Sequence, residues 1–378
     1  MSNKLIKEDK SKKKKPTAGK KILETIKNYD YKKITSSRLF LPIVCLLIVL
    51  LANLITTPDF FVIEYKNHVL SGYLINVINR ASELVILAVG MTLVTAASGG
   101  QDISVGAVMS VAAAVCCQIL TGGAREISKY TVVTYIIALV VGILVAGLCG
   151  AFNGFLVSKQ KIQPMIATLI LFTAGRGIAQ LVTKGQITYI HKESYKVLGG
   201  YLPKCPIPTP IFIAILIVII VLLLLKFTAL GMFIESVGIN ARASRLVGLN
   251  STMIKFLAYV ICGLLAGVAG IVASSRIYSA DANNIGLNLE MDAILAVALG
   301  GNALGGGKFS LAGSVIGAYT IQALTTTLYA MEVPADQLSV YKAIVVVLIV
   351  VLQSPVFKRM VSNYKIKKAN KVTMEGGK

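Results

Sequence analysis

Long apolar runs recur between residues 39 and 352 of this chain, and short polar segments separate them. A helix that crosses the hydrocarbon core of a membrane needs about 20 predominantly apolar residues. Hydrophobic residues make up 55% of the 378 residues, which leaves room for roughly ten such runs. The pattern predicts an all-α, polytopic membrane protein with about ten transmembrane helices, some of them broken. The predicted spans are residues 39–55, 74–97, 103–120, 132–157, 164–182, 210–225, 254–273 and 291–301, a ninth that runs to residue 329, and 339–352.

Positive charge is concentrated at the two ends of the chain. The formal net charge is +21, and residues 1–38 hold thirteen Lys or Arg while residues 356–378 hold seven. Basic residues beside spans hold those ends in the cytoplasm. We therefore predict basic cytoplasmic tails at 1–38 and 356–378 around a transmembrane domain at 39–355, in a multi-pass protein of the plasma (inner) membrane. The lysines at 12–15 also suit nucleic acid, but membrane orientation already explains them. We expect contacts with membrane lipid and no nucleic-acid partner.

The sequence holds no pattern typical of catalysis, nucleotide binding or metal binding. The segment GGNALGGGKF at 300–309 differs from a phosphate-binding loop, since Asn302 replaces a required glycine and Phe309 a required Ser or Thr. His68 and His191 are the only histidines, and both fall in predicted loops. Five of the six cysteines lie in apolar runs, where they are expected to pack as small hydrophobic residues. We therefore expect no catalytic residues, no metal and no cofactor.

A polar segment, GMFIESVGINARASRLVGLN at residues 231–250, separates two of the apolar runs. Its composition predicts a short helix in water, and Ile234, Val237, Ile239 and Leu246 make one of its faces apolar. Such a helix is either a passive helix on the membrane surface or a docking site for a partner. We favour a docking site for a partner. If the protein drives uphill transport with ATP, the energy must come from another chain, because this chain has no nucleotide motif of its own.

Polar residues also occur inside the predicted spans. Arg176 lies well inside the fifth span, where it needs a partner such as Glu83 or Asp292. Polar side chains are costly against lipid and are expected to face the protein interior or an aqueous path. The candidate pathway residues are Asn79, Arg80, Asp102, Ser104, Asn153, Arg176 and Asp292.

Glycines interrupt the apolar sequence at residues 98–110, SGGQDISVGAVMS. Asp102 or Ser104 is expected to cap the helix that follows. Irregular backbone at membrane depth occurs only where protein or water covers it. The break therefore lines the pathway or its cytoplasmic mouth, or it is a capped turn between two spans. Elsewhere, the spacing of Gly150 with Gly154 and of Gly263 with Gly267 is typical of helices that pack closely.

Four stretches resemble permease subunits of sugar ATP-binding-cassette importers of the ribose, xylose and galactose group. They are INRASELVILAVGMTLVTAASGGQDISVGAVMS (78–110), IQPMIATLILFTAGRGIAQLVTKGQI (162–187), TALGMFIESVGINARASRLVGLN (228–250) and ADANNIGLNLEMDAILAVALGGNALGGG (280–307). Within that group, residues 162–177 and 280–290 are most similar to one of the two paired permeases of the galactofuranose importer. Gln101 departs from the group, which usually has an aliphatic residue there.

The resemblance implies a division of labour. An extracytoplasmic sugar-binding protein would deliver galactofuranose or another monosaccharide to two permeases, identical or paralogous, and an ATP-binding-cassette ATPase subunit would drive transport. Residues 235–250 would be the coupling helix that fits a groove on the ATPase. An ion-coupled secondary transporter for a small polar solute is the alternative, in which Asp102, Arg176 and Asp292 would form an ion or proton relay. The expected coupling residues are Glu235, Gly238, Asn240, Arg242, Ala243, Arg245 and Gly248.

Overall fold

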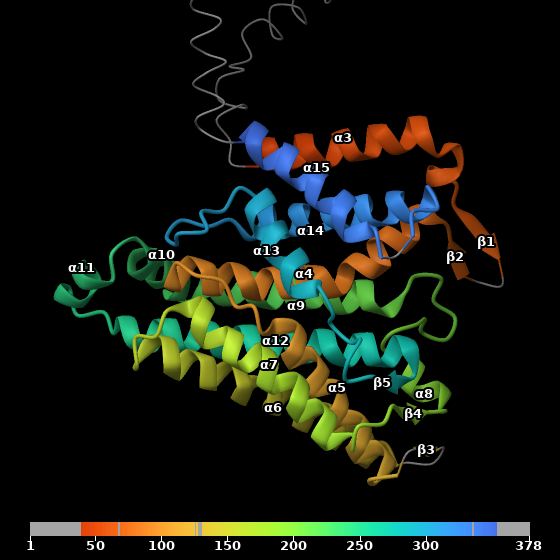
Figure 1. Cartoon of the computed structure of the whole chain (residues 1–378), viewed down its shortest axis with the longest axis horizontal. Coiled ribbons are helices and arrows are strands. Elements are labelled where there is room, and N and C mark those ends of the chain that lie inside the picture. The colour runs from red at the N-terminus through yellow and green to blue at the C-terminus, as the bar shows by residue number, and fades with distance from the viewer. Residues whose placement is uncertain (1–38, 67–68, 125, 128–130, 335, 354–378) are drawn as a thin grey trace, which may run out of the picture.

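The computed structural model describes residues 39–66, 69–124, 126–127, 131–334 and 336–353. The predicted tails at 1–38 and 356–378, together with His68, lie outside the described residues. Most of the described chain is helical (Figure 1). The longer helices are α3 (Phe40–Thr56), α4 (Tyr73–Ser98), α5 (Val105–Thr121), α6 (Val132–Ser158), α7 (Pro164–Val182), α9 (Thr209–Phe227), α12 (Ser251–Ile277), α13 (Leu289–Leu299), α14 (Leu311–Ala330) and α15 (Leu338–Gln353).

These ten helices overlap the ten predicted spans one for one. Five of them, α4, α6, α7, α9 and α12, are long and apolar enough to cross a membrane by length and composition. Helices α3 and α5 are shorter apolar helices, and α13 has only 11 residues. The predicted helical, polytopic membrane fold is confirmed, whereas the total number of crossings stays a prediction.

The long helices form layers in Figure 1. Helices α3 and α15 lie at one edge, followed by α13 and α14; α4, α9 and α12 lie in the middle, and α5, α6 and α7 form the other edge. Two short helices, α10 (Leu230–Ile239) and α11 (Ala241–Leu246), lie at one end of the molecule. We call this end the α11 end. Short strands and α8 (Glu193–Lys196) lie at the opposite end, which we call the strand end.

Helix α4 is the most enclosed of the candidate spans, since α9, α10, α12, α13 and α14 all pack against it. Glycines allow another close contact, between α6 and α12. A Cβ atom at Gly150 would lie 2.4 Å from the carbonyl oxygen of Tyr259 and 3.0 Å from the Cα of Gly263. A Cβ at Gly267 would lie 2.7 Å from the Cβ of Ala146. The close helix packing predicted from the glycine spacing is confirmed.

Short strands are a small departure from the all-α prediction. Strands β1 (Glu64–Lys66) and β2 (Val69–Ser71) form an antiparallel pair that follows η1 (Pro58–Phe61). Strand β4 (Thr188–Ile190) pairs in parallel with β3 (Glu126–Ile127) and antiparallel with β5 (Ser279–Ala280). These pairs tie together loops at the strand end, so the loop at 183–209 lies far from α11 (Figure 1).

The helix break at 98–110 is present, but its cap differs from the prediction. Helix α4 ends at Gly99, whose φ of 67° is left-handed and suits glycine. Ser104 occupies the N-cap position of α5 without a side-chain cap bond. Its hydroxyl and its backbone N–H instead donate to Oδ1 of Asp102, at 2.6 and 2.9 Å. The predicted cap is therefore wrong, because Asp102 binds the residue before the helix and not the first turn.

Candidate functional site

The polar segment at 231–250 forms two helices at the α11 end, where one helical segment was predicted. Asn240 separates them, since its φ of −155° and ψ of 96° are extended. Its side-chain Oδ1 accepts hydrogen bonds from the backbone N–H groups of Arg242 and Ala243, both at 3.0 Å. Asn240 thus caps α11 and fixes the turn between α10 and α11.

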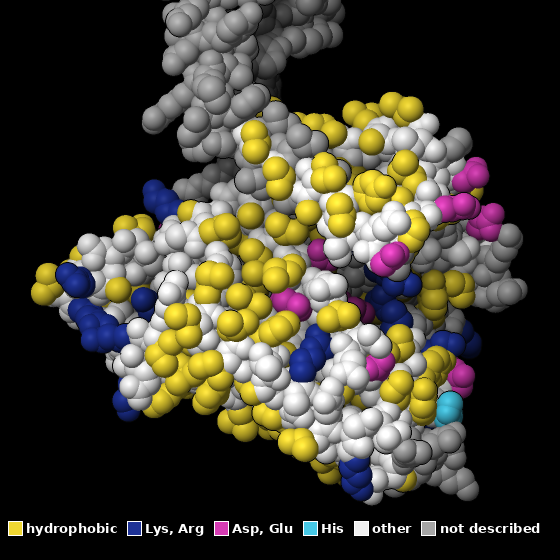
Figure 2. All heavy atoms as spheres, viewed as in Figure 1, with side chains coloured by type: hydrophobic (Ala, Val, Ile, Leu, Met, Phe, Trp, Pro, Cys, Tyr) yellow, Lys and Arg dark blue, Asp and Glu magenta, His cyan; other side chains and the backbone are white. Residues whose placement is uncertain are grey.

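The tip of this segment, by which we mean Leu246 and Val247, is exposed on the surface. The side chains of Leu246 and Val247 are 89% and 77% exposed. Arg242 and Arg245 are also exposed and lie on the same six-residue helix. Basic side chains gather at this end of the surface in Figure 2, whereas acidic side chains lie in the middle and toward the strand end. The tip therefore offers two exposed apolar side chains, which suit binding in a groove on a partner protein.

Two of the predicted coupling residues face inward. A Cβ at Gly238 would lie 1.9 Å from the carbonyl oxygen of Ala96 and 2.5 Å from the backbone nitrogen of Gly307. Oε1 of Glu235 accepts a hydrogen bond from the backbone N–H of Phe309 at 3.4 Å. Gly238 and Glu235 therefore hold α10 against α4 and the loop at 300–310. The remaining predicted coupling residues that are exposed are Arg242, Ala243, Arg245 and Gly248, with Asn240 as their cap.

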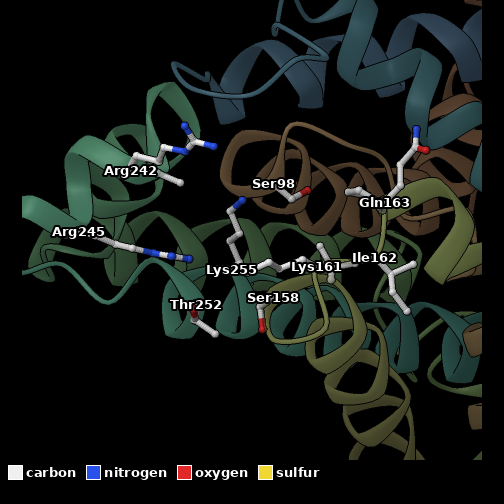
Figure 3. Close-up of a pocket in the computed structure, with 12 residues that line it drawn as sticks. Ser98, Ser158, Lys161, Ile162, Gln163, Arg242, Arg245, Thr252 and Lys255 are labelled. Atoms are coloured by element: carbon white, nitrogen blue, oxygen red, sulfur yellow. The ribbon is translucent and has the colours of Figure 1, made fainter.

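A basic cavity of about 340 Å³, which we call the α11-end cavity, lies beside this segment (Figure 3). Arg242, Arg245 and Lys255 point into it from α11 and α12, and Lys161 lines it from the loop between α6 and α7. Ser98, the last residue of α4, also lines it. One edge of the helix break thus reaches a cavity at the α11 end.

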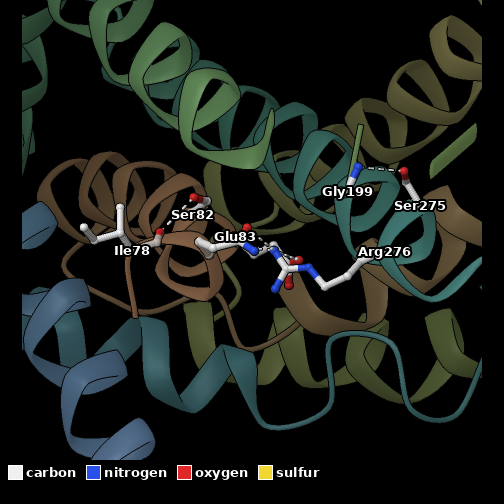
Figure 4. Close-up of polar contacts among 7 residues, drawn as sticks. Ile78, Ser82, Glu83, Gly199, Ser275 and Arg276 are labelled. Atoms are coloured by element: carbon white, nitrogen blue, oxygen red, sulfur yellow. Dashed lines mark hydrogen bonds and ion pairs between the residues drawn. The ribbon is translucent and has the colours of Figure 1, made fainter. Parts of the chain in front are cut away.

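A second cavity, of about 490 Å³, opens toward the strand end between α4, α12, α13, α14 and α15. We call it the strand-end cavity. Nη2 of Arg276 on α12 lies 3.1 Å from Oε1 of Glu83 on α4, and Figure 4 shows the arginine reaching across. Nζ of Lys342 on α15 lies 2.8 Å from Oδ2 of Asp292 on α13. Two charge pairs therefore connect four helices around this cavity.

The walls of the strand-end cavity are rich in hydrogen-bonding groups. Arg80 adds a further positive charge, and Arg276 also donates to the backbone and side-chain oxygens of Asn79 at 3.1 and 3.3 Å. Charges at membrane depth are tolerated when they are paired or face water, and here both conditions hold. The cavity can therefore receive a neutral solute with many hydroxyl groups. Uncharged polar residues complete its lining: Asn284, Asn288, Gln322 and Thr325.

Three of the predicted pathway residues form a closed network away from both cavities. Nδ2 of Asn153 on α6 donates to Oγ of Ser104 at 2.8 Å and lies 3.4 Å from Oδ1 of Asp102. All three side chains are at most 2% exposed. In this structure the network ties the helix break to α6, which is the covered arrangement that irregular backbone in a membrane requires.

Arg176 does not bind Glu83 or Asp292, so the predicted partners are wrong. Its Nη1 donates to the backbone carbonyl oxygens of Ala282, Asn283 and Ile285, at 3.1, 2.9 and 2.7 Å. The reason is position, because α7 faces the loop before α13, whereas Glu83 and Asp292 have basic partners of their own. Arg176 thus holds a loop and does not line the strand-end cavity.

Sequence reasoning missed several residues that the structure places in the cavities. Arg276 and Lys342 complete the charge pairs, and Lys161 and Lys255 complete the α11-end cavity. Each is a basic residue in or beside an apolar run, and a charge in that position could have marked it as a candidate. The sequence could not identify the partners of these residues, because the partners lie on other helices. Among the described residues, no group of three or more His, Cys, Asp or Glu could hold a metal ion.

Comparison with known proteins shows to which family this chain belongs. A family model described as "Branched-chain amino acid transport system / permease component" matches residues 73–352. The chain is 44% identical to the galactofuranose transporter permease protein YtfT of Escherichia coli (strain K12), over 85% of this chain and 92% of the relative. It is 39% identical to the fructose import permease protein FruF of Bifidobacterium longum (strain NCC 2705), over 91% of this chain and 95% of the relative.

A further relative is the ribose import permease protein RbsC of Escherichia coli (strain K12), which is 34% identical over 82% of this chain and 91% of its own length. No solved structure gives a significant match. The family match extends from the first residue of α4 into α15 and thus includes both cavities and the α11 end. The chain belongs to this family of transport-system permease components and is a polytopic membrane protein.

Proposed function

We propose that this chain is the membrane-spanning permease subunit of an ATP-driven importer of monosaccharides, and that a partner ATP-binding-cassette ATPase supplies the energy. The family description mentions amino acids, but the printed names of three relatives above 30% identity specify galactofuranose, fructose and ribose. Another relative is named as a probable ABC transporter permease. Galactofuranose is the favoured substrate, because the permease named for it has 44% identity.

The observation that carries the proposal is the exposed tip of α11. Leu246 and Val247 project from a capped helix and are almost completely exposed, and Arg242 and Arg245 flank them. An apolar pair of this kind is costly in water and gains by entering a groove on a partner. The ATPase is the partner that an ATP-driven permease needs on its cytoplasmic side. We therefore assign ATPase docking to the tip, with Asn240, Ala243 and Gly248 shaping its backbone.

Movement of α11 by the ATPase must also reach the membrane helices, and Glu235 and Gly238 transmit it. Their contacts fix α10 to the last turn of α4 and to the loop at 300–310. A displacement of α11 would therefore move the last turn of α4 and the loop at 300–310 together with α10. A switch of this kind works when the partner binds two arrangements of the permease with different affinity.

The strand-end cavity is where the sugar enters in this proposal. Its paired charges, amides and hydroxyls can exchange hydrogen bonds with sugar hydroxyls, while the pairing keeps the net charge of the wall low. The extracytoplasmic sugar-binding protein would dock at the strand end, and a second permease, identical or paralogous, would complete the path. Both termini lie in the cytoplasm in this arrangement, on the side of α11, and the complex resides in the inner membrane.

The experiment compares two leucine variants in the complex with its ATPase and sugar-binding protein. Leu246→Asp removes an apolar anchor from the tip, whereas Leu304→Asp changes an exposed leucine of the loop at 300–310, outside the tip. Truncating a central apolar anchor typically costs about 2 kcal/mol or more, which is roughly a thirty-fold loss of affinity. We expect Leu246→Asp to abolish both ATPase copurification and uptake of labelled galactofuranose, and Leu304→Asp to preserve ATPase copurification.

Equal uptake by the wild type and Leu246→Asp would contradict the docking assignment. The ion-coupled alternative has its own readout in liposomes that contain the purified chain without the ATPase. Accumulation of sugar on a proton or sodium gradient in those liposomes would refute the proposal and favour a secondary transporter. The charge pairs Glu83–Arg276 and Asp292–Lys342 would then be candidates for the relay.

A further inference from the structure

The basic α11-end cavity lies next to an apolar groove, and the two share Ser158 and Thr252. The groove has a volume of about 440 Å³ and runs between the end of α6 and the start of α12. This is the level at which both helices leave the predicted membrane at the α11 end. A site with a charged compartment beside an apolar one is therefore positioned at the membrane boundary.

Among the described residues, no acidic side chain lines the α11-end cavity beside its basic ones. Lys161, Arg242, Arg245 and Lys255 all line the cavity, and no carboxylate does. Within the part of the chain that the structure describes, none of the four forms an ion pair. The Arg245 Nε–H donates to the Ser251 hydroxyl, at 2.6 Å. Four cations in a space of about 340 Å³ repel one another, so an anion that enters it would be bound strongly.

The adjoining groove combines three apolar side chains with Ser158, Lys159, Asn250 and Thr252. Phe155, Met253 and Phe256 line it, and the first two are 39% and 48% exposed. Lys159 lies with its ammonium group 5.5 Å from the centre of the Phe155 ring, at the rim of the groove. Apolar side chains with a lysine at their edge are typical of protein surfaces at the boundary between acyl chains and headgroups.

We propose that the cavity and the groove together bind one anionic phospholipid of the inner leaflet. The phosphate group would lie among Lys161, Arg242, Arg245 and Lys255, and an acyl chain would follow the groove along Phe155 and Phe256. Basic pockets between membrane helices on the cytoplasmic side bind acidic headgroups in this way. A choline headgroup would add a fifth cation to the site, so a lipid with a net negative charge fits and a zwitterionic one does not.

This lipid would hold α11 in place relative to the membrane helices. Its phosphate would connect α11 to the start of α12 and to the loop between α6 and α7, because residues of all three line the cavity. The lipid would thus limit how far α11 moves when a partner pulls on its tip. The inference does not depend on which solute the protein transports.

The test measures lipid binding to the purified full chain by native mass spectrometry during titration with phosphatidylglycerol or phosphatidylcholine. The double variant Lys161→Gln/Lys255→Gln removes two charges from the cavity. We expect it to bind phosphatidylglycerol about thirty-fold more weakly than the wild type, because each basic residue contributes about 1 kcal/mol to such binding. The wild type should prefer phosphatidylglycerol to phosphatidylcholine by at least about tenfold.

The matched control is Lys226→Gln/Lys308→Gln, since both lysines are exposed and neither lines the cavity or the groove. This control should bind phosphatidylglycerol like the wild type, and the charge-preserving variant Lys161→Arg/Lys255→Arg should do so as well. The proposal is overturned if the glutamine variant keeps wild-type affinity, if the arginine variant loses it equally, or if both lipids bind alike. Displacement of phosphatidylglycerol by excess inorganic phosphate alone would overturn it too, by identifying a soluble anion as the ligand.

Discussion

Gly238 is the position where a single methyl group should uncouple ATPase docking from transport. Its Cα faces the end of α4, and a Cβ there would lie 1.9 Å from the carbonyl oxygen of Ala96 and 2.5 Å from the nitrogen of Gly307. Side-chain carbons essentially never approach other atoms closer than 3.0 Å. In Gly238→Ala, α10 must therefore move away from α4 by about 1.1 Å.

The energetic cost of this shift follows from the atoms involved. All the close neighbours belong to the backbone, so no flexible side chain can rotate away. Overpacking of this kind costs about 1–3 kcal/mol, and the hydrogen bond of 2.9 Å from the Gly307 N–H to the Ala96 oxygen is weakened as well. A coupling loss of about 1–3 kcal/mol corresponds to roughly a 5- to 150-fold lower population of the competent arrangement. We expect sugar uptake to fall within this range.

The assay separates transmission from docking. Gly238→Ala leaves Leu246 and Val247 exposed at the tip, so the ATPase should still copurify while uptake falls. Gly305→Ala is the matched control, because it lies in the loop that faces α10 and a Cβ there meets nothing within 4 Å. Normal uptake by Gly238→Ala at wild-type levels in the membrane would refute the idea that this contact carries the motion.

Three further changes test the polar contacts. Asp292→Lys combined with Lys342→Asp should restore much of the stability that either single change removes, about 1–3 kcal/mol of coupling in reversible detergent unfolding; additive effects would contradict a direct pair. Arg176→Ala should increase hydrogen exchange in the loop before α13, because three carbonyl groups lose their donor, and unchanged exchange would argue against this anchoring role. Ser314→Ala should cost about 1–3 kcal/mol, measured by the same unfolding, because buried Asn302 loses an acceptor; a neutral effect would indicate that water replaces it.

The sequence was sufficient for the features that depend on local composition. The length of apolar runs predicts where helices lie. Glycines four residues apart within one helix predict close packing, and Gly150 of α6 indeed contacts Gly263 of α12. The helix break at Gly99 was also predictable, because paired glycines are poor helix formers. The exposed segment around Asn240 followed from its polarity alone. These predictions require no knowledge of which helices are neighbours.

Contacts between distant segments were out of reach of the sequence. Arg276 pairs with Glu83 across about half of the chain, and its sequence neighbours give no sign of that partner. The same holds for Gly238, since a glycine in a polar helix has the same appearance whether it faces a partner protein or its own backbone. The assignment of Arg176 to Glu83 or Asp292 failed for this reason: charge alone suggests many partners, and helix packing selects among them.

The break after α4 and the loop at 300–310 explain how a displacement of α11 could reach the strand-end cavity. A Cβ at Gly306 would lie 3.0 Å from the Cα of Gly99, so the break after α4 and the loop at 300–310 meet beside α10. In that loop, Nδ2 of Asn302 donates to Oγ of Ser314 at 2.7 Å, which links the loop to α14. The loop directly follows α13, which has 11 residues and is about 16 Å long. The far end of α13 carries Asp292, so a shift of the loop would act on the Asp292–Lys342 pair through one short, stiff helix.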